Sequence, residues 1–182
     1  MLGCGTVGSQ IARLLVANKA DLTSRAGAQI ELVKVAVRDA KVKRDGIPDN
    51  LITTDANSIV NDPNIDLIIE VIGGISPAKE LILTALKNGK SVVTANKALL
   101  AKSGAELYEA ASKANVDLYY EAAVAGAIPI LRPLRESLVG DQVVRIMGIV
   151  NGTTNYILTK MDESGTAFAD ALKQAQDLGF AE

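Results

Sequence analysis

The stretch GCGTVG, residues 3–8, has the glycine spacing of a dinucleotide-binding loop. Glycine at these places permits a tight turn from a strand into a helix and lets the backbone approach a pyrophosphate at the helix N-terminus. Only Met1 and Leu2 precede the loop, so most of its strand is expected to lie before the first residue. An ordinary strand–helix turn is the alternative, because such spacing also arises by chance. The elements that follow favour a dinucleotide loop.

Short apolar runs alternate with helix-like segments after this loop. Strands are expected at residues 30–37, 66–72, 90–95 and 116–124, and helices at residues 7–20, 55–62, 76–89 and 104–115. Asp55 and Ser76 are expected as N-caps, with Pro77 as a first helical residue and Gly89 as a stop. The alternation predicts an α/β fold with a doubly wound parallel sheet of the Rossmann type, lacking its first strand.

The pattern changes after Gly126. A helix is expected at residues 127–138, a strand at 143–150, and two further helices within residues 151–161 and 167–180. We therefore predict an NAD(P)-binding domain at residues 1–128, incomplete at its N-terminus. Residues 129–182 are predicted to begin an α+β substrate and dimerisation domain.

Composition excludes several classes of function. The 182 residues are 48% apolar and 22% charged, with a net charge of −2 and scattered Lys and Arg, which indicates no nucleic-acid or membrane surface. No apolar run has membrane-spanning length, no export signal is visible, and the single cysteine favours the cytoplasm. The absence of histidine excludes Ser-His-Asp triads, His–carboxylate relays and His-bearing zinc sites within this chain.

Arg38 follows the second expected strand, where an NAD-selective protein usually has an acidic residue. A guanidinium suits a phosphate, so the position predicts use of NADP, with NAD also possible as a cofactor. Lys41 and Lys43 could add positive charge, although a solvated basic loop explains these two lysines better.

Six stretches together resemble the homoserine dehydrogenase family: LGCGTVG, VAVRD, TANKALLA, YYEAAVAGAIPI, NGTTNYIL and AQDLGFAE. They span essentially the whole chain in the family's order. The resemblance implies reduction of L-aspartate 4-semialdehyde to L-homoserine with NAD(P)H, on the route to threonine, methionine and isoleucine. It also implies a homodimer or homotetramer.

The resemblance implies a cofactor site whose members come from five stretches. They are Gly3, Gly5, Thr6, Val7, Gly8, Arg38, Gly73, Gly74, Lys97 and Gly179. Arg38 would face the 2′-phosphate, and Gly73 and Gly74 would line the cleft between adenosine and nicotinamide. Lys97 would contact the nicotinamide end and share in catalysis, because ligands gather beyond the carboxyl ends of strands in such sheets. A solvated surface lysine is the alternative for Lys97.

Two further sites are implied by the resemblance. A monovalent cation such as sodium would be held by the Glu121 carboxylate and the carbonyls of Val124, Gly126 and Ile128, an oxygen set that suits a hard ion. The substrate would be bound by Gly152, Thr153, Thr154 and Glu182. Without the resemblance, Glu121 is a polar rim residue, and a helix N-cap is the alternative role for the threonines, compatible with substrate binding.

In the family, AQDLGFAE continues to an Asp and a proton-donating Lys, so we expect a fragment cut at both ends that has no turnover alone. Two other functions stay open. One is a related amino-acid or semialdehyde dehydrogenase. The other is an NADP-sensing module without chemistry, although such a module has no need of the polar NGTTNYIL stretch.

Overall fold

Residues 1–3 lie at the centre of a parallel sheet. Leu2 forms parallel bridges to Ala36 on one side and to Glu70 on the other. The Gly3 amide donates a hydrogen bond to the Ala36 carbonyl at 2.9 Å. The glycine loop therefore follows the middle strand position of the sheet.

The computed structural model describes residues 1–149 and 151–180. The chain divides into two units, Met1–Gly126 and Ala127–Glu182. In the described ranges, no helix combines the length and the apolar character needed to cross a membrane.

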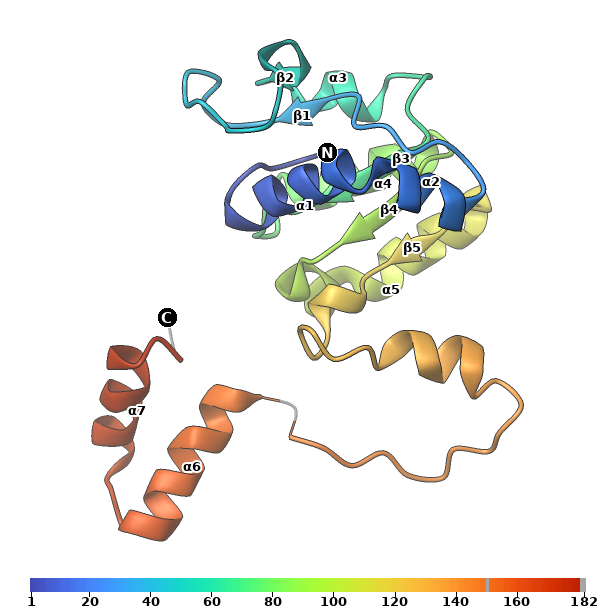
Figure 1. The fold of residues 1–182 in the computed structure, drawn as a ribbon. Coiled ribbons are helices and arrows are strands. Elements are labelled where there is room, and N and C mark those ends of the chain that lie inside the picture. The colour runs from blue at the N-terminus through green and yellow to red at the C-terminus, as the bar shows by residue number, and fades with distance from the viewer. Residues whose placement is uncertain (150, 181–182) are drawn as a thin grey trace. The chain divides into compact units, whose positions relative to one another are not determined.

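The strands of the first unit are short and all run parallel (Figure 1). They are β1 (Val35–Ala36), β2 (Ile52–Thr53), β3 (Leu67–Glu70), β4 (Ser91–Thr94) and β5 (Leu118–Tyr119). With Leu2 joining β1 to β3, the spatial order is β2-β1-Leu2-β3-β4-β5. The strand order reverses at Leu2, as in a doubly wound nucleotide-binding sheet, so the predicted fold class is confirmed.

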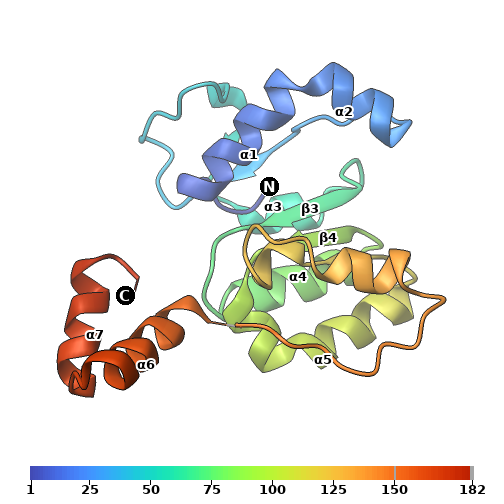
Figure 2. The ribbon, with the colours of Figure 1, turned by 60° about the horizontal axis from the view of Figure 1, so that its bottom comes forward.

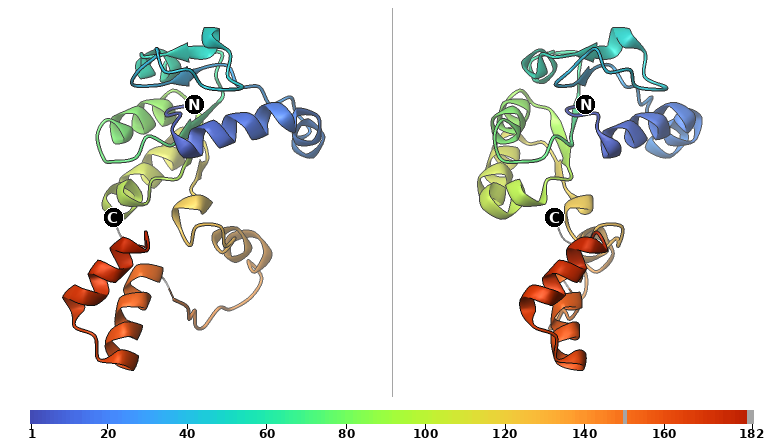
Figure 3. Two further views of the ribbon diagram at one scale, coloured as in Figure 1. Left: turned by 60° about the vertical axis from the view of Figure 1, so that its left-hand side comes forward. Right: turned by 90° about the vertical axis from the view of Figure 1, so that its left-hand side faces the viewer.

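Helices cover both faces of this sheet (Figure 3). One face carries α1 (Thr6–Ala17) and α2 (Lys19–Ala26), and the other carries α4 (Ala78–Lys87) and α5 (Lys97–Ala114). β3 and β4 lie side by side next to α4 and α5 (Figure 2). The shorter helices are α3 (Ala56–Val60) and the 3₁₀ turns η1 (Asp49–Leu51) and η2 (Glu121–Ala123).

The main core lies between the sheet and α4 and α5. Its fully buried large side chains are Leu2, Ile59, Ile68, Ile82, Leu86, Leu99 and Leu107. A smaller cluster joins Met1, Val35 and Ala12 of α1 on the other face. Burial on both faces of the sheet explains why the strand sequences are continuous apolar runs.

Several expected helix ends are confirmed. The Asp55 carboxylate caps α3 by accepting hydrogen bonds from the amides of Asn57 and Ser58 at 2.9 and 3.1 Å. Gly89 follows the end of α4 with a φ of 74°, a conformation that glycine adopts easily. The expected start of α4 was wrong: its N-cap is Pro77 and not Ser76, so the helix begins at Ala78, one residue later than expected, and the Ser76–Pro77 peptide bond is cis.

Other expected bounds were wrong. The helix expected at residues 7–20 is two helices, because the backbone leaves the helical conformation at Asn18. β1, β3 and β5 are shorter than expected, since a strand extends only as far as its neighbours offer hydrogen bonds. α5 begins seven residues before the expected residue 104, because the Asn96 side chain caps it by accepting from the Leu99 amide at 3.1 Å.

The second unit contains α6 (Gly152–Ser164), α7 (Phe168–Asp177) and a short π-helix, Pro133–Ser137. Ile157, Ala171 and Ala175 form its small core. The strand expected at residues 143–150 was wrong over residues 143–149, which have no regular structure. Val144 is 94% exposed and Met147 is 81% exposed, so this apolar run has the composition of a strand but no hydrogen-bonding partner among the described residues. Val150 lies outside them.

Candidate functional site

The three glycines of the opening loop differ in the space around them. Gly3 has a φ of 97°, and a Cβ on it would lie 2.8 Å from the Val71 carbonyl oxygen. A Cβ on Gly8 would lie 2.4 Å from the carbonyl oxygen of Gly3, which is closer than real contacts allow. Around Gly5 nothing lies within 4 Å. The loop is therefore packed tightly against Val71, which follows β3, and against the first turns of α1, and its backbone at Gly5 is open to an approaching ligand.

The first turn of α1 faces this open space. Gly5 is the N-cap of α1 and has no side chain that could accept a hydrogen bond from the helix. Thr6 and Val7 are exposed in the first turn. The first amides of a helix lack partners within the helix and carry its positive dipole end, so this turn can donate to an anion.

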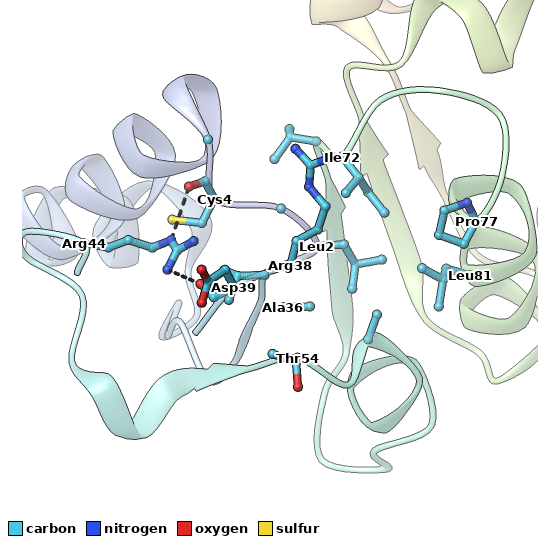
Figure 4. A pocket seen from close by; sticks show the side chains of 15 residues that line it. Leu2, Cys4, Ala36, Arg38, Asp39, Arg44, Thr54, Ile72, Pro77 and Leu81 are labelled. Atoms are coloured by element: carbon cyan, nitrogen blue, oxygen red, sulfur yellow. Dashed lines mark hydrogen bonds between the residues drawn. The ribbon is translucent and has the colours of Figure 1, made fainter. Parts of the chain in front are cut away.

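A cavity of about 750 Å³ lies beside the loop, where the strand order reverses (Figure 4). Its walls come from the glycine loop, from the ends of β1 and β3, and from the starts of α3 and α4. They include Gly3, Gly5, Arg38, Asp39, Arg44, Thr54, Ala56, Ile72, Pro77 and Leu81. A cavity at the carboxyl ends of the strands and at the reversal point is where nucleotides bind in such sheets.

Two arginines contribute positive charge to this cavity. Arg38 is exposed two residues after the end of β1 and lines the wall, in the place that the sequence predicts for a 2′-phosphate contact. Figure 4 shows Arg44 on the glycine-loop side, where its guanidinium donates to the carbonyls of Asp39 at 3.1 Å and Cys4 at 3.4 Å. Arg44 thereby links the glycine loop to the turn after β1.

Gly73, Gly74 and Lys97 lie beyond the carboxyl ends of β3 and β4 and are not part of the cavity wall. Gly73 and Gly74 have φ values of 75° and 72°. Lys97 is exposed as the first residue of α5. Its amide donates to the Ala95 carbonyl at 3.1 Å, so the turn from β4 into α5 is tight.

The second unit brings together the two stretches, NGTTNYIL and AQDLGFAE, that the family resemblance links to the substrate. The Thr153 hydroxyl donates a hydrogen bond to the Phe180 carbonyl, and the rings of Tyr156 and Phe180 meet edge to face with centroids 5.3 Å apart. Gly179, with a φ of 74°, turns the chain toward this contact. Glu182 lies outside the described residues. The closing segment is thus held at the start of α6.

Asn151 takes the capping role at α6, because its side-chain oxygen accepts from the Thr154 amide at 2.7 Å. Gly152 is the first helical residue, so neither threonine serves as the N-cap. Thr154 is exposed and Thr153 is half-buried. The capping alternative for the two threonines was therefore wrong.

The residues expected to bind a cation follow β5. The Val124 amide donates to the Glu121 carbonyl at 3.2 Å, and Ala125 and Gly126 both have a φ of 59°. Ile128 belongs to the second unit. In the described part of the chain no three His, Cys, Asp or Glu side chains gather as metal ligands. A site of one carboxylate and three carbonyls does not need such a cluster, and it stays a prediction.

Sequence reasoning missed three polar residues. Arg44 ends a basic run that contains Lys41 and Lys43. The sequence of this run does not indicate which of the three basic residues lines the cavity. Asn96 directly precedes α5, which is a recognisable capping position. Glu70 is completely buried at the end of β3, and nothing in an apolar run indicates what holds its carboxylate.

Comparison with known proteins places these observations in a family. The family model described as "Homoserine dehydrogenase, NAD binding domain" matches residues 3–121, and the model described as "Homoserine dehydrogenase" matches residues 129–182. This chain belongs to the homoserine dehydrogenase family. A homoserine dehydrogenase of Corynebacterium glutamicum is 52% identical to it over all 182 residues, and one of Bacillus subtilis is 45% identical.

Solved structures of homoserine dehydrogenases have the same fold. That of the Thiobacillus denitrificans enzyme matches the whole chain with a TM-score of 0.84 and 48% identity, over 42% of the solved chain. A hyperthermophilic archaeal homoserine dehydrogenase in complex with NADPH matches with a TM-score of 0.78 and 28% identity, over 60% of its length. The chain spans 41% of the length of the Corynebacterium relative and 42% of the Bacillus one.

Proposed function

We propose that the full-length protein interconverts L-homoserine and L-aspartate 4-semialdehyde with NADP, on the route to threonine, methionine and isoleucine. The observation that carries the proposal is the glycine loop of a homoserine dehydrogenase domain, opening onto a cavity at the strand reversal point. Whole-chain similarity to enzymes of that name supports the reaction. Residues 1–128 would form the nucleotide-binding domain, and residues 129–182 would begin the domain that binds substrate.

The chain's own residues fit a dinucleotide. The uncapped first turn of α1, with Gly3, Gly5, Thr6, Val7 and Gly8, would bind the pyrophosphate, because its backbone is open at Gly5. Arg38 would pair with the 2′-phosphate, and this favours NADP over NAD. When bound, the cofactor supplies the hydride. Gly73 and Gly74 would line the cleft between adenosine and nicotinamide, and Gly179 would also contact the cofactor.

Lys97 would act at the reacting end. An ammonium group at the start of α5, close to the carboxyl end of β4, can stabilise negative charge that develops on a carbonyl oxygen. Gly152, Thr153, Thr154 and Glu182 would orient the amino-acid part of the substrate, the carboxylate of Glu182 pairing with the ammonium. The Thr153–Phe180 contact supports this grouping, because it brings the described end of the closing segment to α6.

A monovalent cation such as sodium would be held by Glu121 and the carbonyls of Val124, Gly126 and Ile128. This donor set is all oxygen and carries one negative charge, which suits a weakly held hard ion. Ala125 and Gly126 both have left-handed backbone conformations, which a non-glycine residue such as Ala125 rarely adopts. This unusual turn supports a role for its carbonyl groups as ligands. The enzyme would be a cytoplasmic homodimer or homotetramer.

Fluorescence titration of the full-length protein with NADPH, with and without L-homoserine, tests the proposal. We expect saturable NADPH binding that L-homoserine alters. NADPH binding that does not change when L-homoserine is added would favour a cofactor-sensing module. Binding altered by another amino acid or semialdehyde, but not by L-homoserine, would favour a related dehydrogenase.

A further inference from the structure

The carboxylate of Glu70 is buried at the end of β3 and holds the backbone that follows it. One oxygen, Oε1, accepts from the amides of Ile72 and Gly73 at 2.8 and 3.1 Å. The other, Oε2, accepts from the Thr94 hydroxyl of β4 at 2.5 Å. Glu70 has no exposed surface and Thr94 is 1% exposed. These three donors are neutral, and together they satisfy a group that would otherwise be costly to bury.

Asn96 closes the chain of hydrogen bonds into a ring. The Thr94 hydroxyl oxygen accepts from the Asn96 amide at 3.1 Å. The Asn96 side chain donates to the Gly74 carbonyl at 2.6 Å and caps α5 through the Leu99 amide. The turn after β3 is therefore held from both strands, and the same side chain fixes the start of α5, where Lys97 lies.

The ring lies on one side of Leu2, and Arg38 lies on the other. Arg38 follows β1, whereas Glu70 and Thr94 end β3 and β4. A dinucleotide in a doubly wound sheet lies across the strand reversal, with its pyrophosphate at the glycine loop. With the adenosine half at β1, the nicotinamide half extends over the ends of β3 and β4. Ile72, whose amide Glu70 holds, lines the same cavity as Arg38 from the end of β3.

We infer that Glu70, Thr94 and Asn96 are positioning residues that fix the Ile72–Gly74 turn and Lys97 for the nicotinamide half of the cofactor. The inference rests on the proposed function. The turn itself is exposed and has two residues with positive φ, so packing of side chains does not hold it. The buried polar ring does, and pre-organised geometry of this kind raises the rate of hydride transfer.

The test uses Thr94→Val in the full-length enzyme, with Thr94→Ser as the restoring variant. Valine keeps the shape but removes the donor to Glu70 and the acceptor for Asn96, whereas serine keeps the hydroxyl. We expect Thr94→Val to lower kcat on the order of 10- to 100-fold and to weaken NADPH binding. Binding of 2′,5′-ADP, which carries only the adenosine half, should stay within about twofold. Thr94→Ser should restore kcat and NADPH binding.

Ile68→Val is the matched control, because Ile68 is fully buried on β3 but belongs to no polar ring. It should lower Tm without changing the ratio of NADPH to 2′,5′-ADP affinity. In Thr94→Val, the amide hydrogen exchange rate relative to wild type should rise more in residues 71–75 than in the rest of the first unit. Glu70→Gln should give the same localised acceleration.

Three results would overturn the inference. They are a kcat within twofold of wild type in Thr94→Val, an equal loss of 2′,5′-ADP binding, or an equal loss of kcat in Ile68→Val. If the wild-type enzyme turns over no L-homoserine, the proposed function fails instead. The positioning role of Glu70, Thr94 and Asn96 would then still be tested by hydrogen exchange and by the ratio of the NADPH and 2′,5′-ADP affinities.

Discussion

The glycine loop and the turn that follows β3 are held by opposite means. The glycine loop at residues 3–8 is fixed by the absence of side chains, since a Cβ on Gly3 or Gly8 would collide with backbone oxygens. The turn at residues 72–74 has open space around both of its glycines and is fixed by the buried side chains of Glu70 and Asn96. The first turn depends on close packing of backbone. The second depends on side-chain hydrogen bonds, from the adjacent Glu70 and from Asn96, which lies 22 residues beyond Gly74.

The largest effect is expected from Gly8→Ala. Its Cβ would lie 2.4 Å from a backbone oxygen, and backbone cannot move aside as a flexible side chain can. We expect a loss of about 1–3 kcal/mol in the free energy of unfolding, with loss of NADPH binding because the loop shifts. Chemical denaturation and NADPH titration of the full-length enzyme measure both.

Gly5→Ala is the control for that variant. Nothing lies within 4 Å of its Cβ position, so the free energy of unfolding should stay within about 0.5 kcal/mol of wild type. NADPH binding should still weaken, because the methyl group enters the space that the pyrophosphate needs. Equal destabilisation by both substitutions would show that steric packing does not distinguish the two glycines.

A smaller effect, confined to cofactor choice, is expected from Arg38→Ala. Removal of a charged partner of the 2′-phosphate should lower the ratio of NADP to NAD catalytic efficiency on the order of 10- to 100-fold. Lys43→Ala should leave this ratio unchanged, because Lys43 does not line the cavity. Thr94→Val should also leave it unchanged, since it acts at the nicotinamide half. An unaltered ratio in Arg38→Ala would remove Arg38 from the cofactor site.

The smallest effect is expected at Gly73. Its φ of 75° disfavours residues with a Cβ although space is available, so Gly73→Ala should lower the free energy of unfolding by about 1 kcal/mol. Gly73→Asn should lower it less, because asparagine adopts this conformation more readily. If alanine and asparagine destabilise equally, backbone conformation is not what selects glycine there. Thermal denaturation of the three proteins gives the comparison.

The difference between the two turns also explains what the sequence could predict. The glycine spacing, the Asp55 cap and the stop at Gly89 depend on residues a few positions apart, and all three can be recognised in one segment. Glu70 is held by Thr94, 24 residues further on, so its role becomes visible only when β3 pairs with β4.

At residues 143–149, local composition led to a wrong prediction. The β-branched composition of this run favours a strand, and the expectation failed because a strand also needs a hydrogen-bonding neighbour, which composition does not supply. The early start of α5 was missed for a different reason. Asn96 is a good N-cap, but it lies directly after a buried strand end, where a loop is the usual expectation.

Steady-state turnover of the full-length enzyme with L-homoserine and NADP tests the proposed reaction most directly. We expect NADPH to form at a rate that saturates with both compounds, and to be consumed when L-aspartate 4-semialdehyde is supplied instead. Absence of NADPH formation at saturating L-homoserine and NADP, in protein that binds NADPH, would contradict the proposed reaction.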